Sequence, residues 1–135
     1  MTQRSKTLTG LVAAIVLLLV LAGCASEPSL APGTYTKTIT RDDTTDYMFI
    51  GDWELTLAED NSYSLSKDGR FHEDGTYTVS QDQIMFDQAS TISYTCPATS
   101  TYQWAADGKT LTLTNVDDDC WRSFQLRTHP WSLQD

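Results

Sequence analysis

Residues 51–57 read Gly-Asp-Trp-Glu-Leu-Thr-Leu, and the large apolar side chains of this segment stand at every second position. In a β-strand, successive side chains point to opposite faces, so Trp53, Leu55 and Leu57 share one face of this segment. Glu54 and Thr56 share the other face. This pattern is typical of a strand that is buried on one side and solvated on the other.

The same alternation recurs along the chain from Gly33 to Trp131, where helical spacing is nearly absent. Threonine and serine fill most of the alternate positions, and β-branched threonine is favoured on the solvated face of a sheet. The other apolar pairs are Tyr35 with Ile39, Tyr63 with Leu65, Tyr77 with Val79, Ile84 with Phe86, Tyr102 with Trp104, and Leu111 with Leu113. Turn-forming pairs fall between these runs, at Asp60-Asn61, Asp68-Gly69, Asp74-Gly75 and Asp107-Gly108. Because such pairs supply the positive φ of tight hairpins, we expect consecutive strands to be joined as hairpins.

These features predict an all-β fold, an antiparallel up-and-down meander of about eight short strands. We expect the meander to close into a barrel, because closure removes the exposed strand edges; a β-sandwich is the alternative. Thr44 to Ile50, where four large apolar residues run together, is predicted as a short helical turn that caps one end. Gln88 to Ser100 is predicted as a long loop.

The first 23 residues differ in composition from the rest of the chain. Met1 to Lys6 carries two positive charges, and Leu11 to Ala22 is an unbroken apolar run of 12 residues. This run is too short for a bilayer core, which needs about 20 apolar residues, so residues 1–23 are predicted to be a signal peptide. Residues 24–32 are expected to form a tether, and residues 33–135 the barrel domain.

The tetrad Leu21-Ala22-Gly23-Cys24 resembles the lipobox of bacterial lipoproteins. The resemblance implies cleavage before Cys24, a diacylglyceryl group on its thiol and acylation, such as palmitate, of the new amino terminus. Two or more acyl chains hold a protein firmly on a membrane surface. The protein is therefore expected on the extracytoplasmic face of a membrane of the bacterial cell envelope. An ordinary secretory signal with a chance cysteine is the alternative, and export follows under either interpretation.

Removing Cys24 leaves two cysteines, Cys96 and Cys120, in a compartment that permits oxidation. A disulfide between them is therefore the expected state. The alternative is a metal or redox pair, but there is no C-x-x-C motif and neither His72 nor His129 flanks a cysteine.

Gly51-Asp52-Trp53 resembles the G-x-W motif that opens a barrel strand in the lipocalin or calycin superfamily. The segments 51–86, 102–120 and 129–131 look like small exported lipocalin-like domains of bacterial lipoproteins. The resemblance implies that Gly51 and Trp53 close one barrel end, with an arginine of the final segment above the tryptophan. Arg122 and Arg127 are the candidates, and Arg127 is preferred.

Six aromatic residues are expected to converge inside the barrel: Trp53, Tyr63, Tyr77, Phe86, Tyr102 and Trp104. They would either line an apolar cavity with a few hydroxyls for orientation, or fill the interior as a core. The first arrangement predicts a protein that binds a small apolar or amphipathic ligand. The second predicts a solid structural or protein-interaction module of the cell envelope.

The composition and the motifs argue against several other functions. With 9 Lys and Arg against 18 Asp and Glu, the chain offers no electrostatic footprint for nucleic acid or anionic lipid. The acidic runs Asp42-Asp43 with Asp46, and Asp117-Asp118-Asp119, lack the spacing of a calcium loop and are interpreted as solvated turns. No catalytic motif is present, and Glu54 is expected to face solvent rather than pair with Glu73. We therefore expect a monomer that is not an enzyme and uses no cofactor or metal; no protein partner is indicated.

Overall fold

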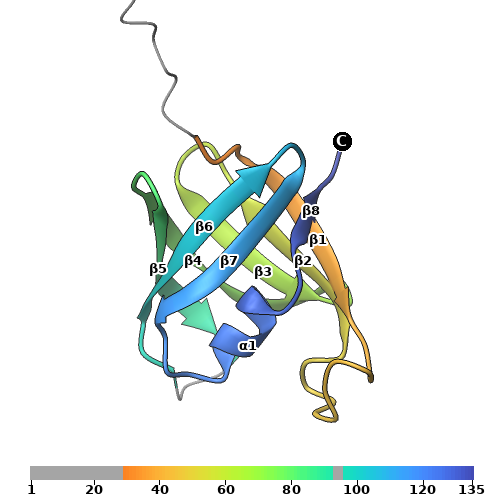
Figure 1. The fold of residues 1–135 in the computed structure, drawn as a ribbon. Helices are drawn as coiled ribbons and strands as arrows, with labels where there is room; N and C mark the ends of the chain where they lie inside the picture. The colour runs from red at the N-terminus through yellow and green to blue at the C-terminus, as the bar shows by residue number, and fades with distance from the viewer. Residues whose placement is uncertain (1–28, 93–95) are drawn as a thin grey trace, which may run out of the picture.

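The computed structural model describes residues 29–92 and 96–135 and confirms the all-β barrel (Figure 1). Eight antiparallel strands follow one another around a closed sheet. They are β1 (Gly33–Ile39), β2 (Gly51–Leu57), β3 (Ser62–Lys67), β4 (Arg70–Val79), β5 (Gln83–Thr91), β6 (Thr99–Asp107), β7 (Thr110–Asp117) and β8 (Trp131–Leu133). One short helix, α1 (Arg122–Arg127), stands between β7 and β8.

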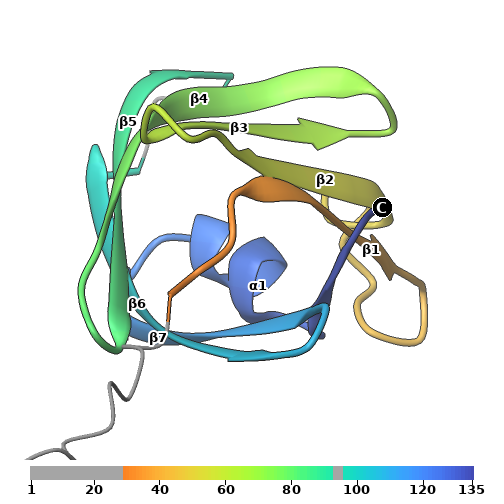
Figure 2. The same cartoon turned by 90° about the horizontal axis from the view of Figure 1, so that it is seen from above.

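The short strand β8 closes the barrel by pairing with both of its neighbours. Leu133 lies opposite Tyr35 of β1, and Trp131 lies opposite Leu111 of β7. Figure 2 shows the closed wall of strands, with α1 inside the outline of the barrel. Within the described residues every strand thus has a partner strand on each side, although β8 pairs with only two residues of β1 and two of β7.

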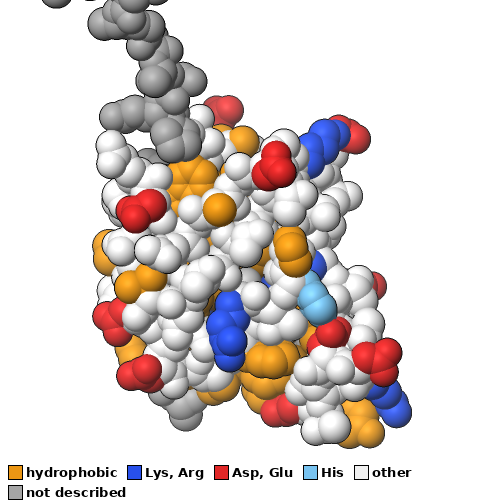
Figure 3. All heavy atoms as spheres, viewed as in Figure 1, with side chains coloured by type: hydrophobic (Ala, Val, Ile, Leu, Met, Phe, Trp, Pro, Cys, Tyr) orange, Lys and Arg blue, Asp and Glu red, His pale blue; other side chains and the backbone are white. Residues whose placement is uncertain are grey.

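The predicted alternation places the apolar side chains inside. Trp53, Leu55 and Leu57 are each at most 1% exposed, and corresponding residues of the other strands join them in one core. Hydroxyl-bearing residues cover most of the outside, so the face drawn in Figure 3 consists mainly of uncharged polar groups and backbone, with isolated charges. The barrel interior is thus a packed core formed by one side of every long strand.

Three local predictions need correction, and one element was not predicted. Asp74-Gly75 is not a turn but lies within β4, where the pairing with β5 shifts by one residue. Residues 44–50 form turns without a helix, and the expected long loop is shorter because β5 extends to Thr91 and β6 begins at Thr99. Helix α1 was not expected, since its six residues are too few to show a helical period.

The two ends of the barrel differ (Figure 1). Residues 29–32 enter at the end that carries the turns 58–61 and 108–109 and the C-terminus, which we call the tether end. Helix α1 and the loop 40–50 lie at the opposite end, which we call the α1 end. Among the described residues, no helix is long and apolar enough to cross a membrane. Residues 1–28, with the expected signal peptide and Cys24, lie outside the described residues.

Candidate functional site

The six aromatic residues predicted to converge do lie together in the core. Each is at most 8% exposed. The ring of Tyr63 packs edge-on against Phe86 at 4.8 Å between centroids, and Phe86 packs against Tyr102 at 6.1 Å. Their contacts with one another and with the surrounding leucines fill the interior.

The polar atoms of these aromatic residues are also engaged within the protein. The Tyr77 hydroxyl donates to the Ala58 carbonyl at 2.8 Å, and the Trp104 indole donates to Ser80 at 3.2 Å. The Trp53 indole donates to the Phe49 carbonyl at 2.7 Å. The five best-formed hollows in the described part of the chain open on the outer surface, and none of the five gathers these six rings around one space. These six aromatic residues therefore form part of the packed core and do not line a ligand cavity.

Gly51 and Trp53 lie at the α1 end, next to the loop 40–50. Gly51 has a φ of +147°, and a Cβ there would stand 2.7 Å from the Asp68 carboxylate, so this position requires glycine. The preferred closing residue, Arg127, is exposed on α1, whereas Arg122 is only 1% exposed.

Lys37 supplies a second interior cation that sequence reasoning missed. It lies opposite Trp53 in the β1–β2 pairing, and its ammonium stands 4.0 Å from the centre of the Trp131 ring. The same ammonium donates to the carbonyls of Leu126 at 3.2 Å and Thr128 at 2.6 Å, which fixes the end of α1. Burial lowers the pKa of Lys37 to about 7.

A buried ion pair joins α1 to the barrel. The Arg122 guanidinium donates from Nε to Asp118 Oδ2 at 3.0 Å, and both side chains are essentially inaccessible. Its other nitrogens donate to Gln88 Oε1 at 2.8 Å and to the Pro97 carbonyl at 3.0 Å. The Tyr102 hydroxyl also donates to Asp118. The interpretation of Asp117-Asp118-Asp119 as a solvated turn is therefore wrong for Asp118, although its two neighbours are exposed.

Two polar side chains close to this pair are buried as well. Glu73 is 2% exposed and accepts a hydrogen bond from the Tyr63 hydroxyl at 3.1 Å. Burial raises its pKa, against the opposing attraction of Arg122. The Gln125 side chain, fully buried on the same helix, has no hydrogen-bond partner for either polar atom among the described residues. This cluster is enclosed, and none of the five hollows is lined by Arg122, Asp118 or Glu73.

The β3–β4 pairing shifts between Leu65 and Ser66, so His72 is an extra residue in β4. A bulge of this kind turns two successive side chains to the same side, and both His72 and Glu73 are buried. The His72 ring packs edge-on between Trp53 at 4.9 Å and Trp121 at 5.7 Å. Burial lowers its pKa to about 4, so the ring is neutral near pH 7.

The most apolar hollow is a groove of about 500 Å³ at the α1 end. Its apolar wall comes from four parts of the chain: Met48, Phe71, Ile92 and Trp121. Met48, Phe71 and Ile92 are 46%, 51% and 61% exposed. Lys67 and Arg70 stand at its rim, and His72 forms its inner wall. We call this feature the α1-end groove; its size and apolar lining are those of small-molecule sites.

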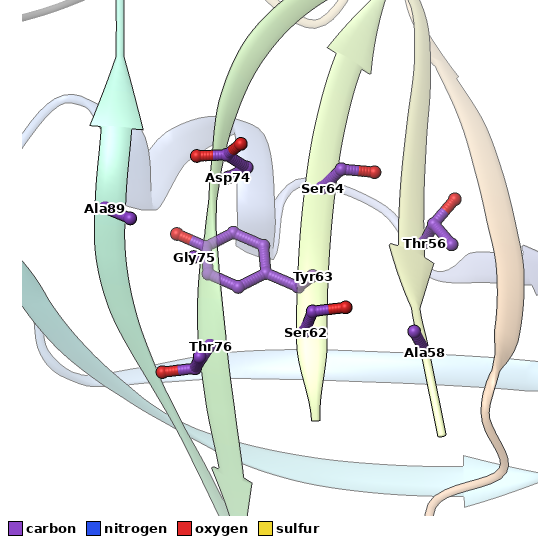
Figure 4. Close-up of a pocket in the computed structure, with 9 residues that line it drawn as sticks. All are labelled: Thr56, Ala58, Ser62, Tyr63, Ser64, Asp74, Gly75, Thr76 and Ala89. Atoms are coloured by element: carbon purple, nitrogen blue, oxygen red, sulfur yellow. The ribbon is translucent and has the colours of Figure 1, made fainter. Parts of the chain in front are cut away.

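A second hollow of about 380 Å³ lies on the outer face of β2–β5 (Figure 4). Gly75 lines this hollow, and β5 packs tightly against it, because a Cβ at this position would stand 2.1 Å from the Asp87 carbonyl oxygen. The Tyr63 ring reaches from β3 across to Gly75, and its surroundings are mostly serine and threonine hydroxyls. This hollow has less apolar surface than the α1-end groove, so it is the poorer ligand site of the two.

The remaining candidates carry no site. Asp42, Asp43 and Asp46 lie in the loop 40–50, where Asp43 pairs with His129 at 2.6 Å and Asp46 accepts from the Met48 amide at 3.0 Å. Within residues 29–92 and 96–135, no group of three or more His, Cys, Asp or Glu side chains is arranged to hold a metal ion. Cys96 and Cys120 form the expected disulfide, with their Cα atoms 5.5 Å apart. The disulfide ties the β5–β6 connection to the start of α1.

Comparison with protein-family models, with curated protein sequences and with solved structures finds no match for this chain.

Proposed function

We propose that this protein is a lipid-anchored, extracytoplasmic barrel of a bacterial cell envelope that binds a small amphipathic molecule in the α1-end groove. The observation that carries the binding proposal is the groove itself. Its side chains Met48, Phe71 and Ile92 are about half exposed and lie together in one groove. The other exposed large apolar side chains, Tyr47, Val79, Met85 and Val116, do not line this groove. A groove of this kind gains stability when an apolar molecule covers it.

The anchor is supported by the first 24 residues, whose basic start, apolar run and Leu21-Ala22-Gly23-Cys24 tetrad resemble those of bacterial lipoproteins. The disulfide agrees with export, because such bonds persist outside the reducing cytosol. Residues 29–32 enter at the tether end, so an anchor at Cys24 would leave the groove on the side of the barrel away from the bilayer (Figure 1).

The anchor has a direct test. Protein extracted from the membranes of its own cells should begin at Cys24 and carry the added mass of a diacylglyceryl group and one further acyl chain. Mass spectrometry of the N-terminal peptide measures this. An unmodified N-terminus at any other residue would contradict the anchor and leave the binding proposal intact.

Replacing Phe71 with serine should weaken ligand binding by about tenfold or more, because a half-buried phenyl wall contributes about 1.5 kcal/mol or more when covered. The probe is N-phenyl-1-naphthylamine, an uncharged apolar fluorophore, titrated into the chain from Ala25. This chain contains all eight strands of the closed barrel. Fluorescence enhancement measures the dissociation constant.

The matched control is Met85→Ser, since Met85 is exposed to a similar degree at 41% but lies outside the groove. It should leave the probe affinity within about twofold, as expected for a residue the probe does not touch. Equal loss in both variants, or no loss in Phe71→Ser, would contradict the groove as the site.

The solid-core interaction module remains a second candidate. It is favoured by the filled interior, where six aromatic residues and α1 occupy the space that an open lipocalin-like cup would offer to a ligand. Native mass spectrometry of the exported protein separates the two functions. A dissociable adduct of small mass supports ligand binding, and a bare protein with a co-purifying protein partner supports the module.

A further inference from the structure

We infer that the ligand of the α1-end groove is a monoanionic amphiphile, an apolar body with one carboxylate, sulfonate or phosphate-type head that pairs with Arg70. This inference rests on the proposed function and specifies its ligand class. It rests on the charged side chains around the groove, because most of these side chains already make hydrogen bonds within the protein and one does not.

Basic groups are scarce in this acidic chain, and two of them lie at the groove. The others in residues 29–135 are accounted for elsewhere. Lys37 and Arg122 are buried with partners, Lys109 pairs with Asp135, Arg41 stacks over the Tyr47 ring at 5.3 Å, and Arg127 is exposed beside β7. A protein with a formal net charge of −9 repels anions in general, so a cationic rim is a local exception.

The two rim cations differ in what they already contact. The Lys67 ammonium donates to the carbonyls of Tyr47 at 3.2 Å and Met48 at 3.1 Å, so it holds the loop 40–50 in place. Arg70 is exposed, and its side chain makes no hydrogen bond or ion pair with any described residue. Its guanidinium is therefore free to bind a planar or tetrahedral oxyanion with two parallel hydrogen bonds.

The one carboxylate at the groove is also engaged. Asp68 accepts a hydrogen bond from the Asp52 amide at 2.9 Å, and its oxygens lie against Gly51. Its charge still lies near the rim, so it disfavours ligands with several negative charges. His72, neutral near pH 7, adds no positive charge to the inner wall. One free guanidinium beside one engaged carboxylate suits a ligand with a single negative charge.

The rest of the ligand must be apolar, because the wall beyond Arg70 is apolar. Phe71 follows Arg70 directly in β4, and Ile92 and Met48 continue the wall from other segments. A head paired with Arg70 thus places its hydrophobic body over Phe71. A groove of about 500 Å³ has room for a bicyclic ring system or a medium-length acyl chain.

The test compares two fluorophores of nearly the same shape. 8-Anilinonaphthalene-1-sulfonate carries one sulfonate, and N-phenyl-1-naphthylamine lacks it. We expect Arg70→Gln to weaken binding of the sulfonate probe about fivefold and to leave the uncharged probe within about twofold, because the variant removes only the charge-assisted hydrogen bonds. Arg70→Lys should recover part of the lost affinity for the sulfonate probe, since lysine keeps the positive charge but cannot donate two parallel hydrogen bonds.

Arg127→Gln is the control, because Arg127 is exposed and lies outside the groove. The inference is overturned if Arg70→Gln weakens both probes equally, weakens neither, or if Arg127→Gln has the same effect. Failure of the proposed function would be a distinct result, in which Phe71→Ser leaves the affinity for both probes unchanged. Thermal unfolding followed by circular dichroism confirms that each variant keeps the wild-type fold.

Discussion

Replacing Arg122 with methionine should lower the free energy of unfolding by about 3 to 5 kcal/mol, the usual cost of removing one partner of a buried ion pair. The methionine fills much of the same volume, so the loss reports charge and hydrogen bonds rather than an empty space. Asp118 would keep its negative charge in the interior, where the Tyr102 hydroxyl and the Cys120 amide are its remaining donors among the described residues. Gln88 Oε1 and the Pro97 carbonyl would each lose a donor.

Urea unfolding followed by tryptophan fluorescence measures this effect, and two further variants identify its cause. Arg127→Met removes the exposed arginine of the same helix and should change stability by less than about 0.5 kcal/mol. The double variant Asp118→Leu/Arg122→Met removes both charges and should be more stable than Arg122→Met alone, because no unpaired charge remains in the interior. A double variant that is less stable than either single one would show that hydrogen bonding, not the isolated charge, dominates.

The wall of the barrel was predictable because its signals are local. Alternating apolar residues and Asp-Gly or Asp-Asn pairs specify strands and tight turns from a few neighbouring positions. The same alternation places Lys37 on the inner face between Tyr35 and Ile39. Sequence reasoning passed over it because lysine is rarely buried, although its contacts with Trp131 and the end of α1 satisfy it here.

The α1 end was not predictable in the same way. The bulge at His72 breaks the alternation, so His72 turns inward beside Glu73, where a regular strand would expose one of the two residues. Arg122 and Arg127 are five residues apart, and at 3.6 residues per turn they fall on different faces of α1. In an extended strand, the strand register would instead have determined which of the two arginines faces the interior. The groove combines the loop 40–50, the start of β4, the end of β5 and the start of α1, which only the closed fold brings together.

Removing the disulfide, by Cys96→Ser with Cys120→Ser, should lower the free energy of unfolding by about 3.5 kcal/mol. On the chain-entropy model, this is the effect of releasing a closed loop of about 25 residues in the unfolded chain. The structure gives a sequence separation of 24 between the two cysteines. Chemical unfolding measures the change, and reduction of the wild-type protein with dithiothreitol should reproduce it. Dithiothreitol should not destabilise the double variant further.

The disulfide and the ion pair stabilise the same junction, so their effects should not add. Pro97, next to Cys96, accepts a hydrogen bond from Arg122, and the Cys120 amide donates to Asp118 at 3.1 Å. Once either the disulfide or the arginine is lost, the β5–β6 connection and the start of α1 are less firmly held. The second change then removes less stabilising free energy than it would alone. The combined variant should therefore lose less stability than the two separate losses predict, by about 1 kcal/mol or more. Strict additivity in the same unfolding experiment would show that the disulfide acts only on the unfolded chain, independently of the buried pair.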